Sequence, residues 1–131
     1  MIVLGINAYH GDSSACLVRD GRLVAAAEEE RFRRIKHWAG FPSESIRYCL
    51  AEAGVDLSAV GHVAINSDPG ANFWKKAWFA VTHRPDPRLI LNRLINRHRR
   101  LSVEEALREN FPQQSFSGRV HYIEHHLAHL A

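Results

Sequence analysis

The first 28 residues hold three apolar runs that lie too close together for helices to separate them. Short runs of this kind, bounded by Gly, Asn and Asp, are typical of buried strands. The pair Asp20-Gly21 separates the second run from the third, and it favours a tight hairpin because both central residues of that turn adopt positive φ. The sequence therefore predicts three consecutive antiparallel strands. It contains neither G-x-G-x-x-G nor G-x-x-x-x-G-K-[ST], which argues against a dinucleotide-binding βαβ unit and a P-loop.

The loop between the first two strands, residues 5–15, concentrates small residues, hydroxyls, an Asp and an imidazole. This mixture lets backbone N–H groups approach an oxyanion while side chains supply donors or a base. We interpret it as a phosphate-side loop, and an ordinary hairpin turn rich in Gly, Asp and Ser is the alternative. Its candidate residues are Asn7, His10, Gly11, Asp12, Ser13 and Ser14.

Two helices are predicted from their termini. Ser43 is a candidate N-cap and Gly54 a C-terminal stop for a segment with apolar residues at helical spacing. The capping box that begins at Ser102 predicts a second helix, which Pro112 ends.

Two further apolar segments, residues 60–66 and 118–124, predict a fourth and a fifth strand. His62 is expected to be a strand-face residue. Asp68 follows the fourth strand, and the ends of strands are places where α/β folds often bind ligands, so it is a further candidate.

Residues 28–42 join an acidic triplet to a basic and aromatic segment. One interpretation is a charged connection whose salt bridges lie on a solvated face. The other is that the cations face a phosphate or carboxylate beside the loop. The cations concerned are Arg31, Arg33, Arg34 and Lys36.

The composition is that of an ordinary globular protein with one domain, since 46% of its 131 residues are hydrophobic and 24% are charged. No apolar run approaches about 18 residues, and the start lacks the basic lead of a signal peptide. We therefore expect a cytoplasmic protein without a membrane partner. Cys16 and Cys49 lie among apolar residues and are expected to be core thiols rather than a disulfide.

The basic excess belongs to the second half of the chain. Residues 1–66 carry seven basic against eight acidic side chains, and residues 67–131 carry ten against six. Within that half, residues 71–100 place aromatic residues before a basic helical pattern, which is one footprint of nucleic-acid or membrane-surface binding. The alternative is an insertion that packs its Trp and Leu on the core or on a partner domain. We favour the insertion because the charge excess is modest, so nucleic acid is not expected as a partner.

Three histidines occur within five residues near the end of the chain. If His125 begins a helix, His129 lies one turn later on the same face, where both imidazoles could ligate one metal ion. No glutamate stands where H-E-x-x-H has its base, so the pattern favours a binding site over a zinc protease. At least one more ligand would have to come from elsewhere, and a chance cluster is the alternative.

Four segments, taken in order, resemble one known family. They are residues 5–15, Ala27–Phe32, Arg34–His37 with Phe41-Pro42, and His125–His129. They look like the N-terminal part of the O-carbamoyltransferases of nodulation-factor and antibiotic biosynthesis. The likeness covers residues 1–66 and 119–131 well and 67–118 poorly, so residues 67–118 are expected to include a family-variable insertion.

The resemblance implies an α/β fold that is half of an actin- and hexokinase-like ATPase domain, with a mixed five-stranded sheet of three antiparallel strands followed by parallel ones. It also implies that carbamoyl phosphate and ATP form a carbamoyl-adenylate, whose carbamoyl group passes to a hydroxyl of a sugar or natural-product precursor. By resemblance, His125 and His129 hold a divalent metal ion, with Fe2+ expected and Zn2+ or Mg2+ as alternatives.

The resemblance assigns roles to the loop as well. His10, Asp12 and Ser13 would line the transfer site, with Lys36 near the leaving phosphate. The residues expected to bind substrate or nucleotide are Asn7, Gly11, Ser13, Ser14 and Arg34.

The chemistry fits these residue types without the family. An acceptor hydroxyl is a poor nucleophile at neutral pH, so a base such as His10, with an ordinary pKa of about 6.5, is suited to take its proton. The carbonyl oxygen gains charge in the transition state, where a metal, a lysine or loop N–H groups can stabilise it.

Enzymes of this family are several times longer, so residues 1–131 are interpreted as a truncated N-terminal subdomain that is inactive alone. The missing partner would be the C-terminal half of the same chain, and an exposed sheet face makes a homodimer a further expectation. Two other hypotheses remain open. One is a non-catalytic metal- or nucleotide-binding module or basic-helix interaction domain, and the other is a metallohydrolase built on the histidine pair.

Overall fold

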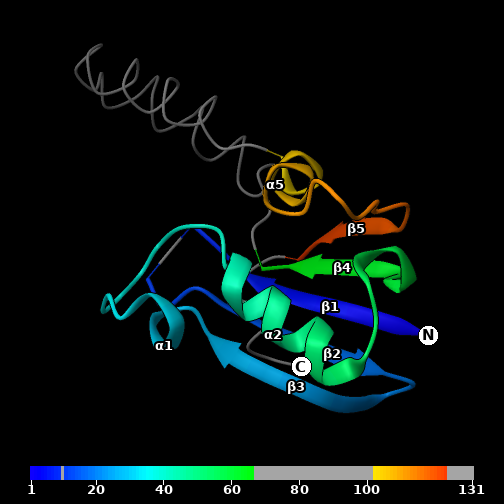
Figure 1. Cartoon of the computed structure of the whole chain (residues 1–131), viewed down its shortest axis with the longest axis horizontal. Coiled ribbons are helices and arrows are strands. Elements are labelled where there is room, and N and C mark those ends of the chain that lie inside the picture. Colours follow the sequence, from blue (N-terminus) through cyan, green and yellow to red (C-terminus); the bar gives the residue numbers. More distant parts are fainter. Residues whose placement is uncertain (10, 67–101, 124–131) are drawn as a thin grey trace, which may run out of the picture.

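Five strands form one mixed sheet in the order β3-β2-β1-β4-β5, as Figure 1 shows for the computed structural model, which describes residues 1–9, 11–66 and 102–123. The central strand β1 pairs antiparallel with β2 and parallel with β4, while β2 pairs antiparallel with β3 and β4 parallel with β5. The mixed sheet expected of half an actin- and hexokinase-like domain is therefore confirmed. The strands are β1 (Ile2–Asn7), β2 (Ser14–Arg19), β3 (Arg22–Glu28), β4 (His62–Ile65) and β5 (Arg119–Tyr122).

The hairpin between β2 and β3 turns at the predicted pair. Asp20 has φ 51° and Gly21 has φ 79°, which are the positive values that the tight turn requires. The backbone N–H of Asp20 also donates to the carbonyl of Met1, which ties the turn to the start of β1. The local signal was sufficient here because the turn depends on only two residues.

Residues 1–66 and 102–123, as far as the structure describes them, contain four helical segments. They are α1 (Glu30–Arg33), α2 (Ser43–Ala53), the 3-10 turn η1 (Leu57–Ala59) and α5 (Val103–Asn110). Gly54 ends α2 with φ 61°, and the side chains of Ser102 and Glu105 form the predicted capping box of α5. The sequence analysis did not predict α1, which is a single turn and buries none of its residues.

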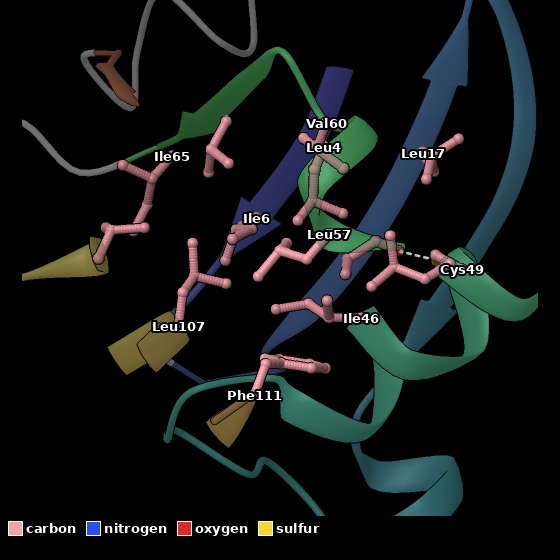
Figure 2. Close-up of a cluster of buried hydrophobic side chains, with 14 of the residues drawn as sticks. Leu4, Ile6, Leu17, Ile46, Cys49, Leu57, Val60, Ile65, Leu107 and Phe111 are labelled. Carbon is pink, nitrogen blue, oxygen red and sulfur yellow. Dashed lines mark hydrogen bonds between the residues drawn. The ribbon is translucent and has the colours of Figure 1, made fainter. Parts of the chain in front are cut away.

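The core lies between one face of the sheet and the helices α2 and α5, as Figure 2 shows. From the sheet, alternating residues such as Leu4, Ile6 and Leu17 point to this face, because side chains alternate along a strand. They meet Ile46 of α2 and Leu107 of α5. Each fully buried side chain of this kind stabilises the fold by roughly 1.5–3 kcal/mol.

The intervening residues of the central strands, such as Gly5 and Asn7 in β1, point to the other face of the sheet. On this second face His62 of β4 lies beside His121 of β5, with 3.0 Å between His62 Nδ1 and His121 Nε2. His62 is thus a strand-face residue, as predicted.

Among the described residues, no helix is both long and apolar enough to span a bilayer. The predictions for His10, for Asp68, for residues 71–100 and for the histidines at 125 and 129 fall outside the part of the chain that the structure describes.

Candidate functional site

The loop between β1 and β2 is fastened at Ser13, which is fully buried. Its backbone N–H donates to the carbonyl of Trp38 at 3.0 Å, and its carbonyl accepts from the N–H of Glu29 at 2.9 Å. Its hydroxyl donates to the carbonyl of Gly40 at 2.8 Å. The loop is therefore held between the end of β3 and the segment that leads to α2, and the Ser13 hydroxyl contributes to this packing.

A second contact joins the same two segments at the surface. Asp12, with φ 64°, and His37, with φ 54°, bring their side chains together, and 2.9 Å separates Asp12 Oδ1 from His37 Nδ1. The hydrogen bond and charge of Asp12 raise the pKa of His37 above its ordinary value. Because the shift is upward, the ion pair is complete below the ordinary imidazole pKa and is lost as the pH rises through the raised value. Both side chains are largely exposed, so this contact orients the loop more than it stabilises the fold.

Glu29 is the buried charge that organises the other side of the loop, and its side chain is fully excluded from solvent. One carboxylate oxygen accepts from Arg33 Nε at 2.7 Å and from the backbone N–H of Glu44 at 3.2 Å. The other accepts from the backbone N–H and the hydroxyl of Ser45, at 2.8 and 2.9 Å. Burial alone raises the pKa of Glu29, but the hydrogen bonds from Ser45, Arg33 and Glu44 outweigh it and leave the pKa below its ordinary value.

This arrangement corrects the predicted start of α2. The N-cap position is occupied by Pro42, not Ser43, and no side chain within the helix start caps it. Instead the distant Glu29 carboxylate accepts the orphan N–H groups of the first turn, where a negative charge also interacts favourably with the helix dipole. The hydroxyl of Ser43 accepts from Arg33 Nη2 at 3.0 Å.

The basic segment divides into one structural cation and three exposed ones. Arg33 is bound to Glu29, and its guanidinium lies 4.5 Å from the centre of the Trp38 ring. Arg31, Arg34 and Lys36 are exposed. Glu29 and Arg33 form a partly buried ion pair that builds the fold, rather than a salt bridge on a solvated face, and the interpretation of the other cations as phosphate contacts stays a prediction.

A hollow of about 290 Å³ lies where β1 and β4 end and β2 begins. Asn7, Ser14 and Asn66 contribute its polar groups. Its floor is made by small residues, and a Cβ added to Gly5 would lie 2.7 Å from Cys16 Sγ, so glycine keeps this floor open. Cys16 therefore lines the hollow and is half-buried, whereas Cys49 is a buried core thiol; both are free.

The predicted loop residues divide into three groups. Asn7 and Ser14 line the hollow, while Ser13 is buried beneath the loop. Gly11 and Asp12 are exposed at the loop tip, and no atom lies within 4 Å of a Cβ added at Gly11.

Sequence reasoning missed three residues of this region. Glu29 could have been found from the alternation that makes Ala25 and Ala27 point inward, which places Glu29 on the same side. Asn66 carried a weak signal, because it directly follows a buried strand. Trp38 carried no signal that distinguishes it from any other aromatic residue in a charged segment.

The proposed metal ligands His125 and His129 lie outside the described residues. Within the described residues, no cluster of three His, Cys, Asp or Glu side chains could hold a metal ion.

Comparison with known proteins identifies a family. Residues 2–131 match the family model described as carbamoyltransferase N-terminus. The chain is 33% identical over 126 residues to the nodulation protein NolNO of Sinorhizobium fredii. This alignment covers 94% of the chain and 17% of NolNO. It is 51% identical over 71 residues to the uncharacterized protein sll1178 of Synechocystis, covering 54% of this chain and 12% of that one. The matched parts are thus a small share of these relatives' length.

Among solved structures, YeaZ from Pseudomonas aeruginosa is 29% identical to this chain, with a TM-score of 0.38. The match covers 53% of this chain and 30% of that one.

Proposed function

This chain belongs to the carbamoyltransferase N-terminus family, and on that basis we propose that it contributes the acyl-transfer site of an ATP-dependent O-carbamoyltransferase. In this proposal water cleaves carbamoyl phosphate to carbamate and phosphate, and the carbamate oxygen then attacks the α-phosphorus of ATP, which forms carbamoyl-adenylate and releases pyrophosphate. The carbamoyl group is then transferred to a hydroxyl-bearing small molecule. The acceptor is proposed to be a hydroxyl of a sugar or of a natural-product precursor. Since the matched part is a small share of its relatives, this activity is assigned to the whole protein.

The observation that carries the proposal is the fastened loop beside the hollow. The carboxyl ends of β1 and β4 meet there, at the edge of the sheet where ligands of open α/β folds bind. The loop is anchored through Ser13, whose N–H, carbonyl and hydroxyl are all hydrogen-bonded, and this anchoring fixes the loop beside the hollow, as a preorganised site requires. The exposed Lys36 and Arg34 lie on the segment that packs against the loop and supply positive charge for a departing phosphate.

The transfer step is an acyl substitution. The acceptor oxygen forms a bond to the carbamoyl carbon, the bond from that carbon to the phosphate oxygen of the adenylate breaks, and AMP leaves with the electron pair. The hydroxyl proton passes to a base, for which His10 is proposed because imidazole titrates near neutral pH. Asp12 lies on the same loop as His10, and its contact with His37 of the neighbouring segment orients the loop.

His125 and His129 are proposed to hold a divalent metal ion, with Fe2+ as first choice and Zn2+ or Mg2+ as alternatives. When bound, such an ion would polarise a phosphoryl or carbonyl oxygen. The steps above depend on the chain's own groups and not on the identity of that ion.

The protein is proposed to act in the cytoplasm together with the remainder of the same polypeptide. Two copies are also proposed to associate through the second face of the sheet, and analytical ultracentrifugation measures the mass of the assembly.

The test uses the protein as its gene encodes it, incubated with 14C-carbamoyl phosphate and ATP. Hydroxylamine replaces the unknown acceptor, because its attack on carbamoyl-adenylate releases N-hydroxyurea and AMP. The proposal expects protein-dependent formation of labelled hydroxyurea only when ATP is present. Because hydroxylamine attacks without a base, the role of His10 is measured separately with a hydroxyl-bearing acceptor in place of hydroxylamine. With that acceptor, His10→Ala should lower the rate by about a hundredfold or more if its imidazole is the base. Protein-dependent label release that does not require ATP would refute the adenylate route, and an unchanged rate with the hydroxyl-bearing acceptor in the variant would remove His10 from its role.

A further inference from the structure

Two asparagines at the carboxyl ends of neighbouring parallel strands form a chain of hydrogen bonds. Asn7 ends β1, and Asn66 directly follows β4. Asn66 Nδ2 donates to Asn7 Oδ1 at 2.8 Å, and Asn7 Nδ2 donates to the backbone carbonyl of Asp12 at 2.9 Å. We call these three groups the amide relay. It connects the loop to the wall of the hollow.

The direction of the amide relay is set by its fixed end. The Asp12 carbonyl can only accept, so Asn7 must turn its NH2 group toward it and its oxygen toward Asn66. Asn66 must then present its own NH2 group to Asn7, which leaves Asn66 Oδ1 as the outer end. Turning either amide around would place two acceptors against each other. The relay therefore ends in an acceptor, whichever way the amide atoms are first assigned.

This terminal acceptor has no hydrogen-bond partner among the described residues, although it is buried from solvent. Buried acceptors without a donor are rare in native proteins, and each calls for an explanation, such as a bound ligand or an ordered water. Asn66 and Asn7 both line the hollow, where Gly5 and Ala64 contribute almost no side-chain volume. A small planar group in the hollow would lie beside Asn66, and to pair with Asn66 Oδ1 it has to bring an N–H or O–H donor.

We propose that Asn66 recognises the NH2 group of the carbamoyl moiety, which donates to Asn66 Oδ1. This inference rests on the proposed function and adds a specificity-determining residue to it. A carbamoyl group is planar, and its nitrogen is a donor that does not accept. An acetyl group has the same shape but carries a methyl group there, which leaves the Asn66 oxygen without a donor. A site built to pair a polar substrate atom rejects the analogue that lacks it.

The carbamoyl group can arrive on phosphate or on AMP, and two pairs of stable probes distinguish these sources. Carbamoylphosphonate and acetylphosphonate differ only in NH2 against CH3. Adenosine 5′-sulfamate and adenosine 5′-methanesulfonate differ in the same way and stand in for the adenylate. Calorimetric titration of the gene-encoded protein measures all four dissociation constants without requiring turnover.

The inference predicts that wild-type protein prefers the NH2 member of at least one pair by about tenfold or more, since leaving a buried acceptor unpaired has an effect of that order. In Asn66→Ala the preference falls to within about twofold, because the acceptor is gone. Asn66→Leu, which retains the side-chain volume, serves as a second variant and gives the same loss. Asn110→Ala is the matched control, since Asn110 lies at the end of α5 and its amide donates only to the Ala106 carbonyl.

The outcomes separate the two proposals. Equal binding of the two members in both pairs, binding of none of the four probes, or a preference that survives in folded Asn66 variants overturns the inference. A preference that the Asn66 variants lose, in a protein that transfers no carbamoyl group to hydroxylamine, supports the inference and refutes the proposed function. The pair that shows the preference identifies phosphate or adenylate as the carrier.

Discussion

Replacing Glu29 by alanine tests how the site is held together. The substitution removes an acceptor of four hydrogen bonds and leaves two N–H groups of the first turn of α2 without a partner. Loss of a helix cap costs about 1 kcal/mol, and each further lost hydrogen bond has a similar effect. The ion pair with Arg33 adds only about 1 kcal/mol, because the Arg33 side chain is 33% exposed and solvent screens it. We expect Glu29→Ala to lower the free energy of unfolding by about 3–4 kcal/mol in total.

Urea and thermal unfolding followed by circular dichroism measure this change. For a chain of this size, 1 kcal/mol corresponds to about 3–5 °C, so the unfolding midpoint should fall by about 9–20 °C. Glu28→Ala is the matched control, since Glu28 is the exposed neighbour at the end of β3 and should change stability by no more than about 0.5 kcal/mol. Equal stability of the two variants would refute the role assigned to Glu29.

The role of Glu29 also predicts how the free energy of unfolding changes with pH. The folded pKa of Glu29 is depressed, so its charge stabilises the fold above the ordinary carboxyl pKa of about 4.3. This contribution is lost as the pH falls through the depressed folded value. The stability difference between wild type and Glu29→Gln should therefore be largest near neutral pH and shrink below about pH 4.3. A difference that is constant down to pH 2 would contradict the assignment.

Two further predictions follow from packing. Gly118→Ala should destabilise the chain by about 1–3 kcal/mol, because a Cβ there would lie 2.5 Å from the Gly61 carbonyl oxygen. Gly61→Ala should be milder, because the nearest atom to a Cβ at Gly61 lies at 3.7 Å. Equal unfolding midpoints of the two variants would contradict this. Burial raises the pKa of Cys49 to about 11, so this thiol should react with a thiol reagent only after denaturation. The half-buried Cys16 should be labelled in the native chain. Peptide mass spectrometry measures which cysteine carries the label. Rapid labelling of Cys49 in the native chain would contradict the packing of α2 against the sheet.

The local signals in the sequence predicted the elements well. The Asp20-Gly21 turn, the Gly54 helix stop and the capping box at Ser102 each depend on residues within a few positions of one another. Such signals do not require knowledge of the rest of the chain. The mixed sheet itself was expected from the resemblance to a known family, which the order of these elements matches.

The long-range electrostatics of the site could not be predicted in the same way. The start of α2 is capped by Glu29, which lies 15 and 16 positions before the N–H groups that it accepts, and no local pattern connects them. The acidic triplet looked solvated because composition does not say which of three carboxylates faces inward. The hydrogen bond between Asn66 and Asn7 could not be predicted either, since the two residues are 59 positions apart in the sequence.

The most direct test of the central claim, that the loop and the hollow form one carbamoyl-transfer site, is a comparison of Asn7→Ala with Asn110→Ala in the gene-encoded protein. Asn7 lies where the loop, the hollow and the amide relay meet, while Asn110 lies at the end of α5. The account predicts that ATP-dependent formation of labelled hydroxyurea falls by about tenfold or more in the first variant and stays within about twofold of wild type in the second. Equal rates in folded samples of both variants would contradict it.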